Sequence, residues 1–313
     1  MKIFTKICLC VCMIFICLAI VCLGVGAALG SGLKEVRQMM DNGELDIGDL
    51  HIGRWWFFWG PDFDDAKAER TLSGVVSERF PADRVQELDI QIKFGEVIIK
   101  NSTSDNIEIT VDAPRRYQYR CSLEDGLAEL VDETSHSVWN MGMKAGEKIK
   151  VTIAIPEGKK FEEVTFCTNA GRIEITHPVT AENVDFEINA GELVADQVMA
   201  ADEFTAKVDA GRLDVAHFSA ETLETDCGMG EIAMHGKVSD GLSANCGMGR
   251  IDLGLIGREE DYDYTISCGI GVVKLNGKSY TTLGTDKDID HDSDNEIELS
   301  CGMGEIDLTV EEE

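Results

Sequence analysis

The fold is decided by a short motif that is repeated several times in the chain. Its clearest copy is residues 301–308, CGMGEIDL. Near copies begin at Cys227 and Cys246, and a looser copy begins at Cys268. The second glycine of each unit serves as its marker, and the markers are Gly171, Gly191, Gly211, Gly230, Gly249, Gly271 and Gly304, with an isolated early member at Gly95. From Gly171 onward the steps are 20, 20, 19, 19, 22 and 33 residues. A near-fixed period of this size is typical of a solenoid.

Apolar residues change phase at each marker glycine. Phe186 and Ile188 lie at odd distances before Gly191, whereas Leu213 and Val215 lie at even distances after Gly211. Because side chains alternate along a β-strand, a slip of one at the same place in each unit indicates a corner. Glycine suits such a corner because it tolerates positive φ. We therefore predict an all-β fold, a single-stack β-solenoid or β-helix-like domain with about 20 residues per unit and the marker glycines as structural corners.

Charged residues after the corner support stacking of the units in register. Five successive units read Arg172, Glu192, Arg212, Glu231 and Arg250 at this position. Stacked units lie about 4.8 Å apart, and each facing pair of opposite charges contributes roughly 0.2–1 kcal/mol. We interpret this column as a device that sets the register and not as a binding site.

Four cysteines occupy one inward-facing position, three residues before the corner: Cys227, Cys246, Cys268 and Cys301. Met229, Met248 and Met303 follow two residues later and are expected on the same inward side. A sulfur-lined stripe is one way to bind a soft metal such as Cu(I). However, earlier units carry Thr168, Ile188 and Val208 in the cysteine position, and no histidine column accompanies it. We therefore predict a core sulfur column, without a bound metal or cofactor, in which oxidation between units is possible but not required.

The longest step between markers contains an acidic insertion, residues 284–296. Asp288, Asp290, Asp292 and Asp294 offer alternating oxygen ligands of the kind that calcium uses. The spacing resembles the start of an EF-hand loop, but Asn295 stands where a glycine belongs. A solvated acidic loop is the favoured interpretation, with calcium binding as the alternative.

Composition excludes several classes of function. The chain has 313 residues and a net charge of −30, so nucleic acid and anionic lipid headgroups are poor partners. Its eleven cysteines show no tight spacing and do not indicate a disulfide framework. No nucleophile motif or phosphate-binding glycine loop is present, so we predict that the protein is not an enzyme.

The N-terminal part of the chain predicts a membrane anchor. Residues 7–29 form an uninterrupted apolar run, long enough for one membrane-spanning helix, although cleavage as a signal peptide is an alternative. We divide the chain into an anchor (1–30), a linker (31–83) and the solenoid (84–313). The linker carries an aromatic cluster at 54–59, either an interfacial belt or a cap on the solenoid. The solenoid has an irregular part (101–160) and regular repeats (161–313). The expected location is the bacterial cytoplasmic membrane, single-pass, with the C-terminal domain outside.

This arrangement resembles the putative adhesin family of bacterial β-strand-repeat proteins. The resemblance rests on the apolar N-terminus, on the strand that ends in residues 153–158 (IAIPEG), and on the glycine-centred units from 168–173 to 301–306. It implies surface adhesion and supplies no catalytic residues to transfer. We expect a non-enzymatic, membrane-anchored surface protein that presents an acidic β-solenoid for binding or scaffolding. The alternatives are a bactofilin-like polymerising scaffold, a sensor or regulator of envelope state, and a carbohydrate-active β-helix enzyme. The sequence indicates neither an extracellular ligand nor an oligomeric state.

Overall fold

The computed structural model describes residues 70–72, 74–134, 148–280 and 285–312. All of them belong to the compact unit formed by residues 66–313. The predicted anchor at 7–29 and the aromatic cluster at 54–59 lie outside the described residues. Among the helical segments that the structure does describe, none is long and apolar enough to cross a bilayer.

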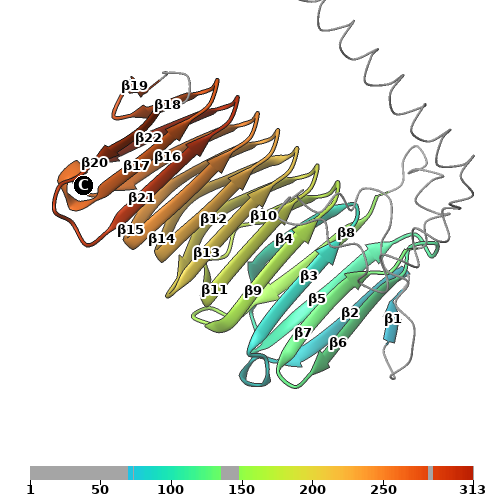
Figure 1. Cartoon of the computed structure of the whole chain (residues 1–313). Coiled ribbons are helices and arrows are strands. Elements are labelled where there is room, and N and C mark those ends of the chain that lie inside the picture. Colours follow the sequence, from blue (N-terminus) through green and yellow to red (C-terminus); the bar gives the residue numbers. More distant parts are fainter. Residues whose placement is uncertain (1–69, 73, 135–147, 281–284, 313) are drawn as a thin grey trace, which may run out of the picture. The chain divides into compact units, whose positions relative to one another are not determined.

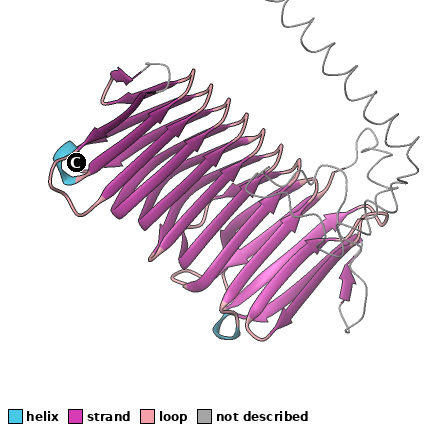
Figure 2. Ribbon diagram, viewed as in Figure 1, coloured by secondary structure: helices cyan, strands magenta, loops and turns pink. Residues whose placement is uncertain are grey.

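The described residues form an all-β structure that contains only two short 3-10 turns, η1 (Ala82–Arg84) and η2 (Glu259–Asp261) (Figure 2). The strands at the N-terminal end of the unit are β1 (Arg70–Leu72), β2 (Gly74–Pro81), β3 (Glu87–Ile92), β4 (Glu96–Asn101), β5 (Asn106–Ala113), β6 (Tyr119–Glu124), β7 (Leu127–Asp132) and β8 (Lys150–Ile155). The repeats follow as β9 (Phe161–Thr168), β10 (Arg172–Ile175), β11 (Val179–Ile188), β12 (Glu192–Ala200), β13 (Glu203–Val208), β14 (Arg212–Cys227), β15 (Glu231–Cys246) and β16 (Arg250–Ile256). The last strands are β17 (Asp263–Cys268), β18 (Val272–Leu275), β19 (Lys278–Tyr280), β20 (Thr285–Ile289), β21 (Glu296–Cys301) and β22 (Glu305–Glu311).

Each repeat contributes one rung with two arms. We name each rung by its corner glycine. The arms before the corners stack in parallel as the entry sheet, for example β11 on β9 and β13 on β11. The arms after the corners stack in parallel as the exit sheet, for example β12 on β10 and β14 on β12. The strands β14 and β15 run through a second corner and belong to both sheets. The predicted β-solenoid repeat fold is therefore confirmed, and Figure 1 shows the rungs stacked side by side.

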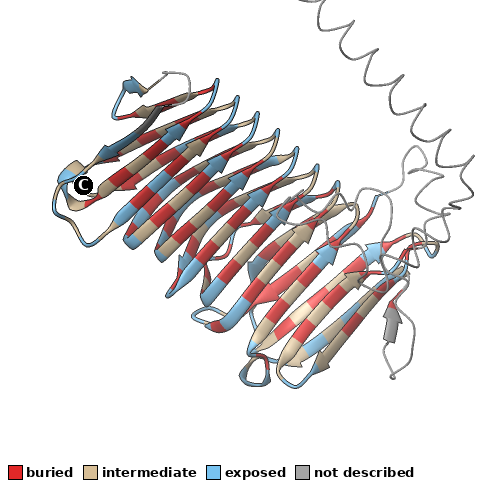
Figure 3. Cartoon of the chain, viewed as in Figure 1, coloured by how far each residue is buried: buried red, intermediate tan, exposed pale blue. Residues whose placement is uncertain are grey.

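The core lies between the two sheets because side chains alternate along each arm. Buried and exposed residues follow one another strictly through β13 and through the first four residues of β14 (Figure 3). Aromatic rings stack from rung to rung inside. The ring centroids of Phe166 and Phe186 are 5.6 Å apart, and those of Phe186 and Phe204 are 5.2 Å apart. Such pairs contribute about 0.5–1.5 kcal/mol beyond the area they bury.

The Gly95 rung is not isolated, contrary to the expectation from sequence. Strand β4 pairs in parallel with β10, and β3 pairs with β9, so this rung stacks directly on the Gly171 rung. The intervening residues 101–160 form additional strands at the N-terminal end, where β5 pairs antiparallel with β2 and with β8. They extend the same stack rather than interrupting it.

The last rung does not lie at the end of the stack. Strand β21 pairs with β15 on one side and β17 on the other, and β22 likewise lies between β16 and β18. The spatial order is therefore Gly230, Gly249, Gly304, Gly271, as the dark red strands among lighter ones show in Figure 1. Short antiparallel strands, β20 on β17 and β19 on β18, cover the end. Glu311 therefore ends a strand that lies inside the stack.

Close packing, and not positive φ, makes glycine necessary at the corners. Of the eight marker glycines only Gly95 has a positive φ, at 102°. A Cβ atom built at Gly211 would lie 2.2 Å from the carbonyl oxygen of Gly191, and one at Gly304 would lie 2.4 Å from that of Gly249. These carbonyls accept the hydrogen bonds that join the rungs, such as Arg212 N–H to Gly191 O at 3.0 Å. The rungs approach too closely at the corner for any side chain.

Candidate functional site

The outer surface of the exit sheet carries a charge ladder longer than the sequence suggested. The residue after each corner alternates in sign along the stack, and Lys150 of β8 extends the column beside Glu96. The column reads Lys150, Glu96, Arg172, Glu192, Arg212, Glu231, Arg250, Glu305. Placing the last rung next to the Gly249 rung sets Glu305 beside Arg250 and continues the alternation. The Gly271 rung has Val272 at this position and could not do so.

Ion pairs engage four bases of this sheet, which are Arg172, Arg212, Arg250 and Lys274. Arg172 lies 2.6 Å from Glu192, and Lys274 lies 2.6 Å from Glu305. Arg212 bonds to Asp214 at 3.0 Å. The Lys274 ammonium, through its hydrogen bond, lowers the pKa of the Glu305 carboxyl. All these side chains are at least partly exposed, so each pair contributes little stability by itself. The exit sheet is thus a surface of largely compensated charge.

Reversing one charge in this ladder creates two like-charged neighbours, so Arg250→Glu should destabilise the fold. It breaks the ion pair with Asp252 and replaces attraction to the register neighbours Glu231 and Glu305 by repulsion. We expect a loss of about 1–2 kcal/mol in the free energy of unfolding, measured by urea denaturation at low salt. Arg250→Gln, which removes attraction without adding repulsion, should cost less. Added salt should reduce the difference in the free energy of unfolding between the two variants. Equal losses of this free energy in both variants would show that the alternation does not set the register.

The outer surface of the entry sheet has a different character, because its acids lack bases to pair with. Three outward-facing columns run along this sheet between the Gly95 and Gly271 rungs, and Lys207 is the only base among their described residues. Their acids are Glu87, Asp89, Glu163, Asp185, Glu187, Glu203, Glu224, Asp226, Asp263, Glu296 and Glu298. None of them is buried. We call this surface the acidic face.

Partial burial makes several carboxylates of the acidic face costly to ionise. Desolvation raises the pKa values of Asp89, Asp185 and Asp226 above the ordinary value. One carboxylate oxygen each of Asp89 and Asp185 is shielded from solvent without a hydrogen-bond partner. Cys167 lies in the same surface, and burial raises its pKa to about 12, so it is a poor nucleophile. A cationic partner would relieve the repulsion among these acids.

The four predicted core cysteines are buried, but the methionines are not. Cys227, Cys246, Cys268 and Cys301 are each at most 3% exposed. By contrast, the exposed fractions of Met229, Met248, Met303 and Ile270 are 61%, 55%, 60% and 74%. The expectation that cysteine and methionine share the inward side is therefore wrong. The three-residue corner turns the strand, so counting parity across it fails. The exposed side chains form an apolar ridge along the corner edge.

The four aspartates proposed as calcium ligands are not brought together. Asp288 and Asp290 line one hollow, whereas Asp294 lines another. The backbone N–H of Asp292 donates to Asp290 at 2.9 Å, within the loop itself. Across the described part of the chain, no group of three or more histidine, cysteine, aspartate or glutamate side chains is arranged to hold a metal ion.

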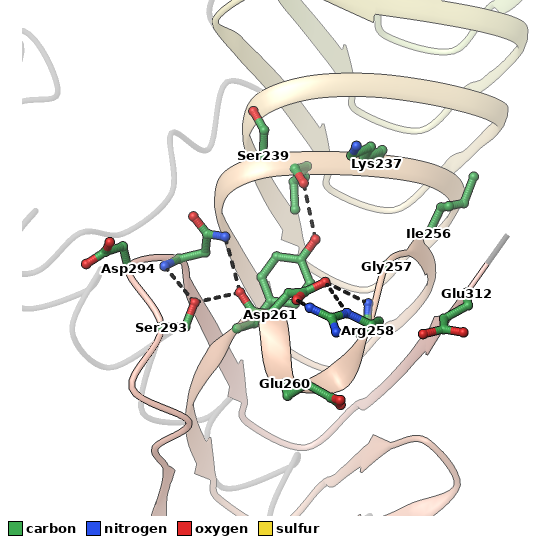
Figure 4. A pocket seen from close by; sticks show the side chains of 13 residues that line it. Lys237, Ser239, Ile256, Gly257, Arg258, Glu260, Asp261, Ser293, Asp294 and Glu312 are labelled. Carbon is green, nitrogen blue, oxygen red and sulfur yellow. Dashed lines mark hydrogen bonds and ion pairs between the residues drawn. The ribbon is translucent and has the colours of Figure 1, made fainter.

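A hollow lies where the inserted rung interrupts the repeat. It measures about 740 Å³ and is formed by segments distant in sequence (Figure 4). The Asp261 carboxylate forms an ion pair with Arg258 at 2.5 Å. The backbone carbonyl of Asp261 accepts hydrogen bonds from the side chains of Ser293 at 2.6 Å and Asn295 at 3.1 Å. The Tyr262 hydroxyl donates to the carbonyl of Val238 at 3.2 Å. These bonds join the crossing segments to one another, so we interpret the hollow as structural. Sequence reasoning did not find it because it depends on rung order.

The chain belongs to the Toastrack DUF4097 family, whose model matches residues 85–298. This confirms the resemblance to the putative adhesin family of bacterial β-strand-repeat proteins. None of the curated proteins matches the chain.

Three solved structures illustrate what the chain is similar to. A putative cell adhesion protein from Clostridium sporogenes is 11% identical, with 76% of this chain and 100% of that chain covered and a TM-score of 0.33. A putative adhesin from Bacteroides fragilis is 12% identical, with 76% and 97% covered and a TM-score of 0.35. A putative lipid binding protein from Parabacteroides distasonis is 14% identical, with 76% and 93% covered and a TM-score of 0.41.

Proposed function

We propose that this protein is a non-enzymatic, adhesin-like surface protein, anchored in the membrane by residues 7–29, which binds a cationic partner on the acidic face. The observation that carries the proposal is the contrast between the two sheets. The exit sheet pairs its charges, whereas the acidic face gathers eleven acids against one base, Lys207. The acids of this face repel one another in the free protein. Binding a partner of opposite charge relieves this repulsion, so the electrostatic contribution to binding is largest on this face.

The contrast between the sheets supplies a matched experiment. Glu163→Gln, Glu224→Gln and Glu298→Gln together remove three charges from the acidic face. Glu174→Gln, Asp214→Asn and Asp252→Asn remove three from the exit sheet. Binding of the full chain to a lysine-rich peptide should weaken about tenfold more for the first set than for the second, equivalent to about 1.4 kcal/mol. Equal weakening would mean that net charge alone attracts the peptide and would overturn the proposed face.

Acid should release the partner from the acidic face. Because desolvation raises the pKa values of Asp89, Asp185 and Asp226, these groups take up protons at a higher pH than ordinary aspartates. Binding should therefore be complete at pH 7 and decline as the pH falls through their raised pKa values. Titration of peptide binding from pH 7 to pH 4 tests this, and binding that holds constant over the range would contradict it.

Surface display is tested separately. Protease added to intact cells should degrade the solenoid if the C-terminal domain lies outside, and should leave it intact if that domain faces the cytoplasm. Polymerisation end to end, as in a bactofilin-like scaffold, is disfavoured by the antiparallel strands β19 and β20, which cover the C-terminal end of the stack. Parallel stacking of a second copy on this end would require their displacement.

A further inference from the structure

Four buried cysteines form one unbroken row in the last four rungs of the stack. Register pairs Cys227 with Cys246, Cys246 with Cys301, and Cys301 with Cys268. In the rung before them, Val208 occupies the same position. The row coincides with the rungs among which the last rung is inserted out of sequence order.

The spacing of this row suits covalent bonding between adjacent rungs. Neighbouring strands place equivalent Cα atoms about 4.8 Å apart, within the range of about 4.4–6.8 Å found across disulfides. The Cys227 thiol donates a hydrogen bond to the carbonyl oxygen of Arg250 at 3.7 Å. A row of four has one way to bond every member to an adjacent neighbour, which is to pair the first with the second and the third with the fourth.

We propose that this row is a thiol–disulfide site, which forms a Cys227–Cys246 bond and a Cys268–Cys301 bond under oxidising conditions. The oxidant is a low-molecular-weight disulfide that acts by exchange. One thiolate attacks the reagent and releases one reduced thiol. The neighbouring thiolate then attacks the mixed disulfide and releases the second. Each protein bond thus forms as one reagent disulfide is reduced, with two protons passing from the protein thiols to the released thiols.

The direction of the pKa of Cys227 indicates which sulfur attacks first in the first pair. The neighbouring Cys246 side chain lowers the pKa of the Cys227 thiol, so Cys227 is expected to attack first. In the second pair, burial raises the pKa of Cys301 to about 11, which makes this thiol slow to exchange while the rungs stay closed.

The bonds would fasten the inserted rung and remain reducible. Cys268–Cys301 joins the Gly304 rung to the Gly271 rung, and Cys227–Cys246 joins the two rungs before it. Parallel side chains hold their Cβ atoms at about the strand spacing, which exceeds the distance of about 3.5–4.5 Å that a disulfide prefers. Closing each bond therefore draws the rungs together, and strained disulfides are the more easily reduced ones.

The test equilibrates the full chain in glutathione buffers from fully reduced to fully oxidised, followed by alkylation of remaining thiols and peptide mapping. One arm uses folded protein and the other refolds it from urea in the same buffers, so that burial cannot hide the outcome. We expect both bonds in the refolded, oxidised sample and a higher urea midpoint than in the reduced sample. Glutathione attached to an added cysteine-containing peptide verifies that the reagent is active.

Two single variants serve as matched controls, since Val208 shows that valine fits the position. Cys246→Val should abolish only the first bond and leave Cys227 open to alkylation. Cys301→Val should abolish only the second and leave Cys268 open. Four free thiols in both arms, or a bond between Cys246 and Cys301, would overturn the proposal.

Discussion

Deleting residues 296–313 should unfold the C-terminal end of the solenoid and leave the N-terminal rungs intact. The deletion removes the rung that separates the Gly249 and Gly271 rungs, so β17 and β18 lose their parallel neighbours. Six buried side chains go with it: Ile297, Leu299, Cys301, Ile306, Leu308 and Val310. At about 1.5–3 kcal/mol for each large apolar side chain, the loss is on the order of 10 kcal/mol. In a linear stack, only rungs next to the gap lose their contacts.

Hydrogen exchange measures this outcome along the chain. Amides of residues 263–289 should lose protection, whereas those of residues 161–227 should keep it. Removing only residues 312–313, which follow β22, should leave the exchange pattern unchanged and serves as the control. Persistent protection of 263–275 in the longer deletion would mean that this rung re-stacks on the Gly249 rung.

A single methyl group at an inner corner should have the next largest effect. Gly304→Ala places a Cβ atom 2.4 Å from the carbonyl oxygen of Gly249 and 2.5 Å from the sulfur of Cys246. The oxygen belongs to the backbone and accepts the hydrogen bond from Glu305 N–H at 3.0 Å, so it cannot move away without breaking that bond. Overpacking of this kind costs about 1–3 kcal/mol. Urea denaturation should show the loss directly.

Gly257→Ala provides the control for this prediction. The nearest atom to a Cβ at Gly257 is the Tyr262 hydroxyl, at 3.3 Å, and no backbone atom of another rung obstructs it. Its effect should stay within about 0.5 kcal/mol, as for surface substitutions away from special features. If Gly304→Ala were equally mild, the corners would tolerate a side chain and close approach would not explain their glycines.

The arms of the solenoid were predictable because the interactions that form them lie within one unit or between neighbouring units. Alternation along a strand, a glycine at every corner and opposite charges on successive rungs all appear in the sequence, and each needs only neighbouring units to be satisfied. The alternating charges after the corners also predict the spatial order of the rungs. Glu305 continues the alternation after Arg250, whereas Val272 interrupts it. The alternation predicts this rung order only if the rungs are allowed to stack in an order that differs from the sequence.

Other features depended on packing that sequence spacing does not encode. The outward position of Met248 follows from the bend of the corner, which ends the two-residue period. The acidic face was hidden because its residues, such as Glu163 and Glu298, come from rungs far apart in the chain and become one surface only after stacking. The aspartates of residues 288–294 suggested a shared site, but the loop directs them to separate hollows.

The inserted rung has a consequence for how the chain folds as it is made. Residues 263–275 leave the ribosome before residues 296–311, yet their parallel neighbours are in that later segment. The stack therefore cannot grow in the order of synthesis beyond the Gly249 rung. The apolar edges on both sides of the gap stay unmatched until residues 296–311 emerge. Closing the gap pairs strands across long stretches of chain, which is a slow kind of step. Completion of the solenoid waits for the synthesis of residues 296–311.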